Sequence, residues 1–312
     1  MKTKKIAVCL WLFHEQLREE YFKLLYPLKE YIDLFLGLPK DCDDQTIKLF
    51  TNYFSNIYIN LFNNEGADIL PFLYQLEQII DKYEYCIKIH SKKSKWGVYR
   101  HCEWRAMLLN DLIGSPTILA NNLYKLENNQ YNMLGNKFFI FHNRESFHTN
   151  KIIEIMQSCN VVSNSKDFCA GTMFMSKCSN LRVFLDHFDY IHSLLSQETL
   201  KVKEKKIGTY CHAMERVFGY VSNIGASDIP TIKIQSDLTN QLTSESFLNL
   251  VHLYNNQCYI QENAHIYGKI IDHHPEYFDI YWLYITDSSK QKKYRYFKDY
   301  SNTHKTEFYH RA

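Results

Sequence analysis

The segment Tyr83–Ser94, YEYCIKIHSKKS, is the most informative for the fold, because it combines a buried strand with a basic cluster at the end of that strand. Its residues Tyr85–Ile89 form an apolar, β-prone run, which predicts a buried strand. A basic cluster of His90, Lys92 and Lys93 follows at the carboxyl end of this strand. Ligands of open α/β sheets bind at that end, and three potential cations there suit an anionic group such as a diphosphate. A solvated charge run that closes a strand is the alternative, and this segment alone does not separate the two.

The preceding segment completes a βαβ unit. Ile57–Leu61 predicts another strand, which leads through Asn63–Phe72 (NNEGADILPF) into a helix with apolar periodicity. Gly66 permits a tight turn. Asp68 stands where a helix N-cap belongs, and an isolated Asp at that place is expected to be a simple cap.

The rest of the chain alternates strands and helices at first and becomes less regular later. Further strands are expected at Lys5–Phe13, Asp33–Leu38, Leu134–Phe141 and Phe168–Ser176. Helices are expected at Glu15–Tyr31 with a division at Pro27, from the Asp41–Asp44 cap to Ser55, and at Tyr99–Leu112, Lys151–Cys159, Leu181–Leu195 and Ile207–Tyr220. We expect a core over 1–226 and a C-terminal extension over 227–312, packed on the core.

Composition narrows the class of protein. The 312 residues carry a net charge of +2, which gives no general attraction to nucleic acid. No run approaches membrane-spanning length and no signal peptide is recognised, so we expect a cytoplasmic protein, with peripheral association at the inner membrane face as an option. Nine cysteines without CxxC spacing suit a reducing compartment and give no structural zinc site.

Four motifs, in order, carry a family resemblance. They are Asn64–Ile69 (NEGADI), Lys88–Ser94 (KIHSKKS), Ala170–Phe174 (AGTMF) and His212–Arg216 (HAMER). Together they make the chain resemble the rhamnan synthesis protein F family of glycosyltransferases from about Lys5 to Val221. Glu65 and Ala67 depart from the family pattern, which has Arg there, and the tail after about Ser227 matches no named pattern.

The resemblance implies an α/β fold of GT-A type, in which a Rossmann-like mixed sheet flanked by helices binds a nucleotide-sugar. Most such enzymes hold a divalent cation with an Asp-x-Asp motif at this strand end. Here His90-Ser91-Lys92 stands at that place. No metal or other cofactor is therefore expected, and Lys92, Lys93 and a protonated His90 would replace the cation.

Two acidic segments elsewhere are weaker metal candidates. Asp41-Cys42-Asp43 precedes a helix, so capping explains its carboxylates. Asp272-His273-His274 lacks metal-ligand spacing, so an ordinary loop is the simpler interpretation.

The resemblance also assigns roles to the remaining motif residues. Glu215 is the expected catalytic base, and His212, on the same helix face, is the second expected catalytic residue. Arg216 shares that face and would contact the donor diphosphate or hold Glu215 in place. A surface pair on a helix is the alternative. The nucleotide is expected at Asn64, Gly66 and Asp68, and the sugar or acceptor at Gly171, Thr172, Met173 and Phe174. Trp104 and Arg105 are expected to be a packed Trp and a surface Arg, and Asp167 is the next candidate for the base.

The expected function is transfer of a sugar, rhamnose by resemblance, from a donor such as dTDP-rhamnose. A glycan or lipid-linked glycan of a surface polysaccharide would be the acceptor, and the reaction would be inverting and independent of metal. The alternatives are a non-catalytic carbohydrate-binding domain, a metal-dependent glycosyltransferase and a nucleic-acid-binding protein. The near-neutral charge argues against the last.

Overall fold

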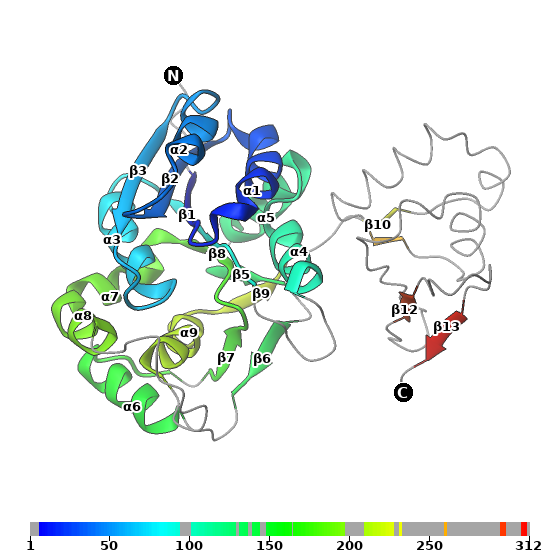
Figure 1. Ribbon diagram of the computed structural model, residues 1–312. Helices are drawn as coiled ribbons and strands as arrows, with labels where there is room; N and C mark the ends of the chain where they lie inside the picture. The colour runs from blue at the N-terminus through cyan, green and yellow to red at the C-terminus, as the bar shows by residue number, and fades with distance from the viewer. Residues whose placement is uncertain are drawn as a thin grey trace, which may run out of the picture. The chain divides into compact units, whose positions relative to one another are not determined.

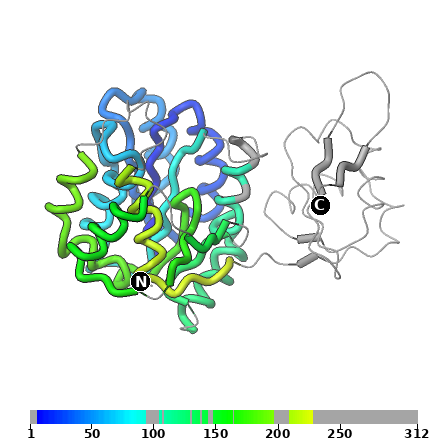
Figure 2. Tube along the Cα trace, turned by 90° about the horizontal axis from the view of Figure 1, so that it is seen from below, coloured from blue at the N-terminus to red at the C-terminus, as the bar shows by residue number. Residues whose placement is uncertain are grey.

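The computed structural model describes residues 6–93, 101–128, 131–136, 139–143, 148–163, 165–196 and 209–227, and four short strands beyond them. The chain divides into two compact units, one of residues 1–93 and 111–228 and the other of residues 94–110 and 229–312. All the residues that form the site below belong to the first unit, which Figures 1 and 2 trace from two directions.

A seven-stranded mixed sheet forms the centre of the first unit. Its strand order is β3-β2-β1-β4-β8-β5-β9, and β1 to β4 run parallel, whereas β8 is antiparallel to both β4 and β5. The strands are β1 (Ile6–Trp11), β2 (Ile32–Pro39), β3 (Ile57–Phe62), β4 (Tyr85–His90), β5 (Met133–Gly135), β8 (Phe174–Lys177) and β9 (Ile224–Ala226). This arrangement confirms the predicted GT-A-like mixed sheet.

The reversed direction of β8 brings together segments that are far apart in the sequence. Lys88 of β4 pairs with Phe174, the first residue of β8. The turn that precedes β8 therefore lies beside the carboxyl end of β4, where the basic cluster begins.

Helices cover both faces of this sheet, with α3 and α7 on one side and α1 and α5 on the other (Figure 1). The helices are η1 (Glu15–Leu17), α1 (Arg18–Leu25), η2 (Tyr26–Leu28), α2 (Asp44–Thr51), α3 (Ile69–Ile79), α4 (His101–Ile113), α5 (Pro116–Glu127), α6 (Thr149–Ser158), η4 (Cys178–Leu181), α7 (Arg182–Asp186), α8 (Phe188–Ser196) and α9 (Tyr210–Tyr220). Pro27 lies in η2, so the predicted division of the first helix is confirmed. None of the described helices is long and apolar enough to cross a membrane.

An aromatic cluster forms one part of the core. The ring of Phe174 meets those of Phe72 and Phe218, with centroids 5.9 and 5.5 Å apart, and Phe218 also meets Phe184 at 5.0 Å. These rings come from β8, α3, α9 and α7, so the cluster joins the sheet to three helices that pack on it. The pairs of Phe174 with Phe72 and of Phe218 with Phe184 are edge-to-face, and such pairs add to the stabilisation from burial.

The second half of the core departs from the expected elements. Residues 134–141 hold parts of two strands, since β5 belongs to the main sheet and β6 (Ile140–His142) pairs with β7 (Asp167–Cys169). The single strand expected at Phe168–Ser176 is likewise divided into β7 and β8 by a turn. Helix α5 is an additional element, and its N-cap is Ser115, whose side chain accepts a hydrogen bond from the Ile118 amide at 3.2 Å.

Beyond residue 227 the described residues form two small pairs of strands. Strand β10 (Thr231–Ile232) pairs with β11 (Tyr259–Ile260), and β12 (Tyr294–Phe297) pairs with β13 (Glu307–His310). The segment Asp272-His273-His274 lies outside the described residues. The division into a core over 1–226 and an extension over 227–312 stays a prediction.

Candidate active site

Lys88 is the buried centre of the site. Its side chain is 1% exposed on β4, and its Nζ forms an ion pair with Asp68 and donates a hydrogen bond to the carbonyl oxygen of Thr172 at 3.0 Å. The ring of Phe72 also faces this ammonium group, with its centroid 5.5 Å from Nζ. A lysine is almost never fully buried unless it is paired, and this one is paired with two partners.

Asp68 is not the simple cap that its position suggested. It occupies the N-cap position of α3, but its φ and ψ are −91° and −3° and its side chain makes no capping hydrogen bond. The carboxylate turns to Lys88 and His90 instead. Burial alone would raise the pKa of Asp68, but His90, Lys88 and Lys92 outweigh it and hold that pKa well below its usual range.

His90 is the neutral member of the basic cluster. Its Nδ1 lies 3.4 Å from Oδ2 of Asp68, and its backbone carbonyl accepts a hydrogen bond from the Tyr21 hydroxyl. Burial lowers the pKa of His90 to about 3, although Asp68 acts in the opposite direction. At neutral pH the imidazole is therefore uncharged, and the positive charge of the cluster comes from its lysines.

Lys92 and Lys93 differ in their surroundings. Lys92 is partly buried, and Lys93 is exposed. Burial lowers the pKa of Lys92, whereas attraction to Asp68 and Glu215 opposes that shift. The two carboxylates that favour the charged form of Lys92 come from segments that are far apart in the chain.

The turn between β7 and β8 has an unusual backbone. Gly171 has φ 90° and Thr172 has φ 55°. Glycine adopts such values readily, but a β-branched residue in the left-handed region is a rare outlier, and such outliers cluster at functional sites. The turn is closed by a hydrogen bond from the Thr172 amide to the Cys169 carbonyl at 3.1 Å.

Glu215 of α9 is held by this turn. Its Oε1 accepts hydrogen bonds from the Gly171 amide at 2.6 Å and the Thr172 hydroxyl at 3.3 Å, and its Oε2 pairs with Nη1 of Arg216 at 3.0 Å. Arg216 also donates to the His212 carbonyl at 2.6 Å and lies over the Phe168 ring. Of the two roles expected for Arg216, the geometry supports the one that holds Glu215 in place.

His212 lies at the exposed start of α9, apart from these contacts. Its Nδ1 is 2.6 Å from the Thr209 hydroxyl, and its ring stacks on that of His148 with centroids 5.3 Å apart. The structure therefore brings Glu215 and Arg216 together and directs the His212 imidazole toward Thr209 and His148.

The other motif residues divide between turn and core. Asn64 is exposed, and Gly66 has φ 61° in the turn before α3. Met173 and Phe174 are buried, so their side chains belong to the core, and the sugar- or acceptor-lining role expected for them stays a prediction.

Two further expectations concern residues outside the motifs. Trp104 is packed as expected, but Arg105 is also buried, which corrects its expected place at the surface. The role of Lys88 was missed. The available signal was a single lysine inside the otherwise apolar run Tyr85–Ile89, which is costly to bury without a partner.

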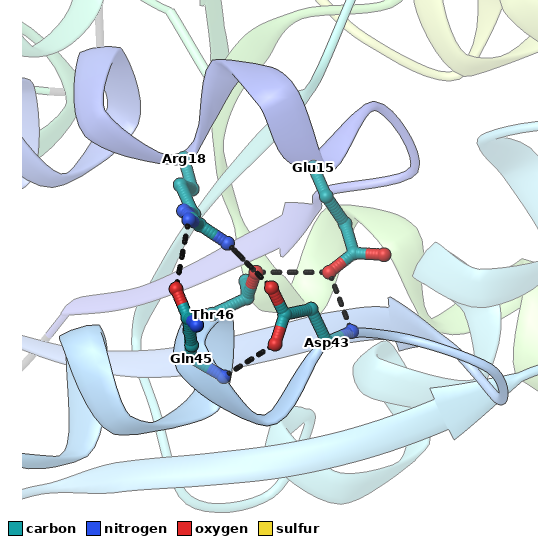
Figure 3. Close-up of polar contacts among 5 residues, drawn as sticks. All are labelled: Glu15, Arg18, Asp43, Gln45 and Thr46. Carbon is teal, nitrogen blue, oxygen red and sulfur yellow. Dashed lines mark hydrogen bonds and ion pairs between the residues drawn. The ribbon is translucent and has the colours of Figure 1, made fainter.

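The acidic segment before α2 serves as a helix cap (Figure 3). Asp43 Oδ1 accepts from the Gln45 amide at 2.9 Å, and its Oδ2 pairs with Arg18 at 3.1 Å. Glu15 completes the network by accepting from the Asp43 amide at 2.9 Å and the Thr46 hydroxyl at 2.8 Å. These contacts confirm the capping interpretation of Asp43.

The end of β4 does not fit the divalent cation that the fold implies. Such a cation takes oxygen ligands, chiefly carboxylates, whereas His90-Ser91-Lys92 offers an imidazole, a hydroxyl and an ammonium group. The Ser91 hydroxyl already accepts the His14 amide at 2.7 Å. Among the described residues no three or more His, Cys, Asp or Glu side chains are grouped to hold a metal ion.

Fold and site together define the class: an α/β protein of GT-A type with a lysine- and carboxylate-containing site at the carboxyl ends of its parallel strands. Residues 1–225 match the family described as rhamnan synthesis protein F, and the chain belongs to that family. The family description concerns the synthesis of a polysaccharide.

Individual relatives are more distant. The chain is 24% identical over 194 residues to the uncharacterized protein WxcX of Xanthomonas campestris pv. campestris strain B100, and equally to that of strain ATCC 33913. The match covers 60% of this chain and 27% of the relative, so the chain spans about a quarter of the length of these curated relatives. Among solved structures, the crystal structure of S. aureus TarS 1–349 is similar with a TM-score of 0.40 and 12% identity, covering 86% of this chain and 71% of that one.

Proposed function

We propose that the chain is a glycosyltransferase that moves a sugar from a nucleotide-sugar donor to a glycan acceptor in polysaccharide synthesis. The observation that carries the proposal is that the Gly171–Thr172 turn connects Glu215 with the carboxyl end of β4, where the basic cluster lies. The Gly171 amide donates to Glu215 at 2.6 Å, and the Thr172 carbonyl accepts from Lys88 at 3.0 Å. Family membership supports it. Rhamnose is the sugar that the family description favours, and a nucleoside-diphosphate rhamnose is the corresponding donor.

The proposed reaction is a single displacement. The acceptor hydroxyl attacks the anomeric carbon while the bond from that carbon to the diphosphate oxygen breaks, and the electron pair leaves with the nucleoside diphosphate. Lys92, aided by Lys93, stabilises the developing charge through charged hydrogen bonds, which contribute about 1.5–3 kcal/mol each. Because the attack comes from the face opposite the leaving group, the anomeric configuration is inverted.

Glu215 is the proposed base for the acceptor proton. Each carboxylate oxygen has two acceptor positions, so the hydrogen bonds from Gly171, Thr172 and Arg216 orient the group and leave capacity for a further proton donor. Lys92 and Lys93 in place of an Asp-x-Asp pair support a reaction without a bound metal.

The test replaces Glu215 with Gln. Turnover is expected to fall by about 10²–10⁴-fold, whereas the affinity for the nucleotide-sugar is expected to stay unchanged because the base acts on the acceptor. Glu154→Gln is a matched control, since Glu154 also accepts two side-chain hydrogen bonds, from Tyr190 at 2.9 Å and Tyr210 at 2.8 Å.

Two results would contradict the proposal. Near-normal turnover of Glu215→Gln would move the search for the base to Asp167, which pairs with His142 at 2.9 Å. Binding of nucleotide-sugars by the unaltered protein without any transfer or hydrolysis would favour a non-catalytic carbohydrate-binding domain.

A further inference from the structure

Lys88 joins two loops that come from distant parts of the sequence. Through its ion pair with Asp68 it contacts the start of α3, and through its hydrogen bond to the Thr172 carbonyl it contacts the turn between β7 and β8. Both contacts leave from one Nζ atom at the carboxyl end of β4. Since the side chain is 1% exposed, it does not itself present a surface to a substrate.

The second of these contacts holds a strained turn. The left-handed conformation of Thr172 persists only where the surroundings impose it, because a β-branched residue disfavours positive φ. The conformation turns the Thr172 carbonyl inward, to the buried ammonium group of Lys88. A charged donor makes a stronger hydrogen bond than a neutral one and satisfies an acceptor that water does not reach.

The same turn determines where Glu215 lies. The Gly171 amide and the Thr172 hydroxyl both donate to Oε1 of Glu215, at 2.6 and 3.3 Å. Loss of the left-handed turn would redirect both donors. The chain of contacts therefore runs from Lys88 through the Thr172 backbone to the carboxylate of Glu215.

We propose that Lys88 is a positioning residue for the transfer reaction, which fixes Glu215 by holding the Gly171–Thr172 turn. This inference rests on the proposed role of Glu215 as the base. The ion pair with Asp68 does not by itself explain a lysine here, because apolar residues of similar size often replace a buried ion pair without loss of stability. Geometry does explain it, since an apolar side chain has no donor for the Thr172 carbonyl.

The test compares two pairs of proteins, each of which differs only at Lys88. Lys88→Met would take the main partner from the Asp68 carboxylate, and Asp68→Asn would take the counter-ion from the buried Lys88 ammonium group. Asp68→Asn and Asp68→Asn/Lys88→Met are therefore compared with each other, and Lys88→Met, in which His90 and Lys92 still face Asp68, is compared with the unaltered protein. Both variants of the first pair carry Asp68→Asn, so any effect of that change on nucleotide binding is the same in the two. Lys125→Met is the control, because Lys125 also donates to a backbone carbonyl, that of Ala226 at 2.9 Å, but away from the turn.

Two readouts are needed. Hydrogen–deuterium exchange followed by mass spectrometry, in peptides that cover residues 170–173, should be at least about tenfold faster in the double variant than in Asp68→Asn, because the turn opens more often. Turnover should fall by about 10–100-fold with an unchanged KM for the donor, since a misplaced base affects the chemical step. Lys125→Met should change neither readout.

The outcomes separate this inference from the proposed function. Unchanged exchange in the turn would overturn the positioning role, and so would faster exchange with unchanged turnover. If the unaltered protein transfers no sugar from any nucleotide-sugar, the proposed function fails, and the exchange measurement alone decides whether Lys88 holds the turn.

Discussion

Lowering the pH from 7 toward 4 should weaken the folded state through His90. Burial lowers the pKa of this imidazole to about 3, against about 6.5 in an unfolded chain. Between these values the unfolded chain binds a proton at His90 and the folded chain does not. Because protonation then stabilises only the unfolded state, the free energy of unfolding falls as the pH falls through this window.

The size of the effect follows from the width of the window. Each pKa unit corresponds to about 1.4 kcal/mol, and pH 4.5 lies about two units below the pKa of the unfolded chain, so lowering the pH from 7 to 4.5 should remove about 3 kcal/mol of stability. Asp68 acts in a different range. Its pKa is lowered in the folded protein, so the stability that it contributes is present above about pH 4, its ordinary value, and is lost below it.

The assay is urea unfolding at pH 7.0, 5.5 and 4.5, with His90→Gln compared with the unaltered protein. The variant cannot bind the proton, so its stability should depend less on pH, and the two curves should diverge by about 3 kcal/mol at pH 4.5. Parallel curves for His90→Gln and the unaltered protein would refute the assignment of a neutral buried imidazole.

Three further predictions concern binding, metal and packing. Lys92→Ala should weaken binding of a nucleoside diphosphate by about 10–100-fold in calorimetry. Lys93→Ala should weaken this binding less because Lys93 is exposed, and equal losses of affinity would contradict this order. Activity should survive EDTA because lysines replace the acidic ligands, whereas loss of activity that Mn²⁺ restores would require carboxylate ligands elsewhere. Gly219→Ala should lower the free energy of unfolding by about 1–3 kcal/mol in urea, because the new Cβ would lie 2.6 Å from the Cα of Phe168 and against the Asp167 carbonyl. Gly37→Ala should cost less, because the three atoms at 3.1 Å from its new Cβ belong to side chains. Equal costs would refute the backbone clash.

The parallel half of the sheet was predictable from the sequence for a local reason. Strands β1, β2 and β4 are each buried on both faces, so they read as continuous apolar runs between helices with amphipathic periodicity. The Asp43 cap was equally local, since its side chain bonds an amide two residues away. Such features depend on neighbours in the chain, and the sequence contains them.

The second half of the sheet was harder because its elements are short and pair over long distances. Strands β5 and β9 have three residues each and pair with one another across the intervening segments. Thr172 is a β-prone residue type, so nothing in the local pattern shows that it adopts a positive φ and divides the expected strand. Tertiary contacts imposed that turn.

The sequence by itself determined the fold class, the family and the place of the basic cluster at a strand end. Only the tertiary structure decided which groups there are partners and which are charged. Asp68 pairs with Lys88 instead of capping its helix, His90 is neutral, and Glu215 is held by a turn from a distant segment. The physical reason is that pairing and protonation depend on distance and burial, and these arise when segments far apart in the chain pack against one another.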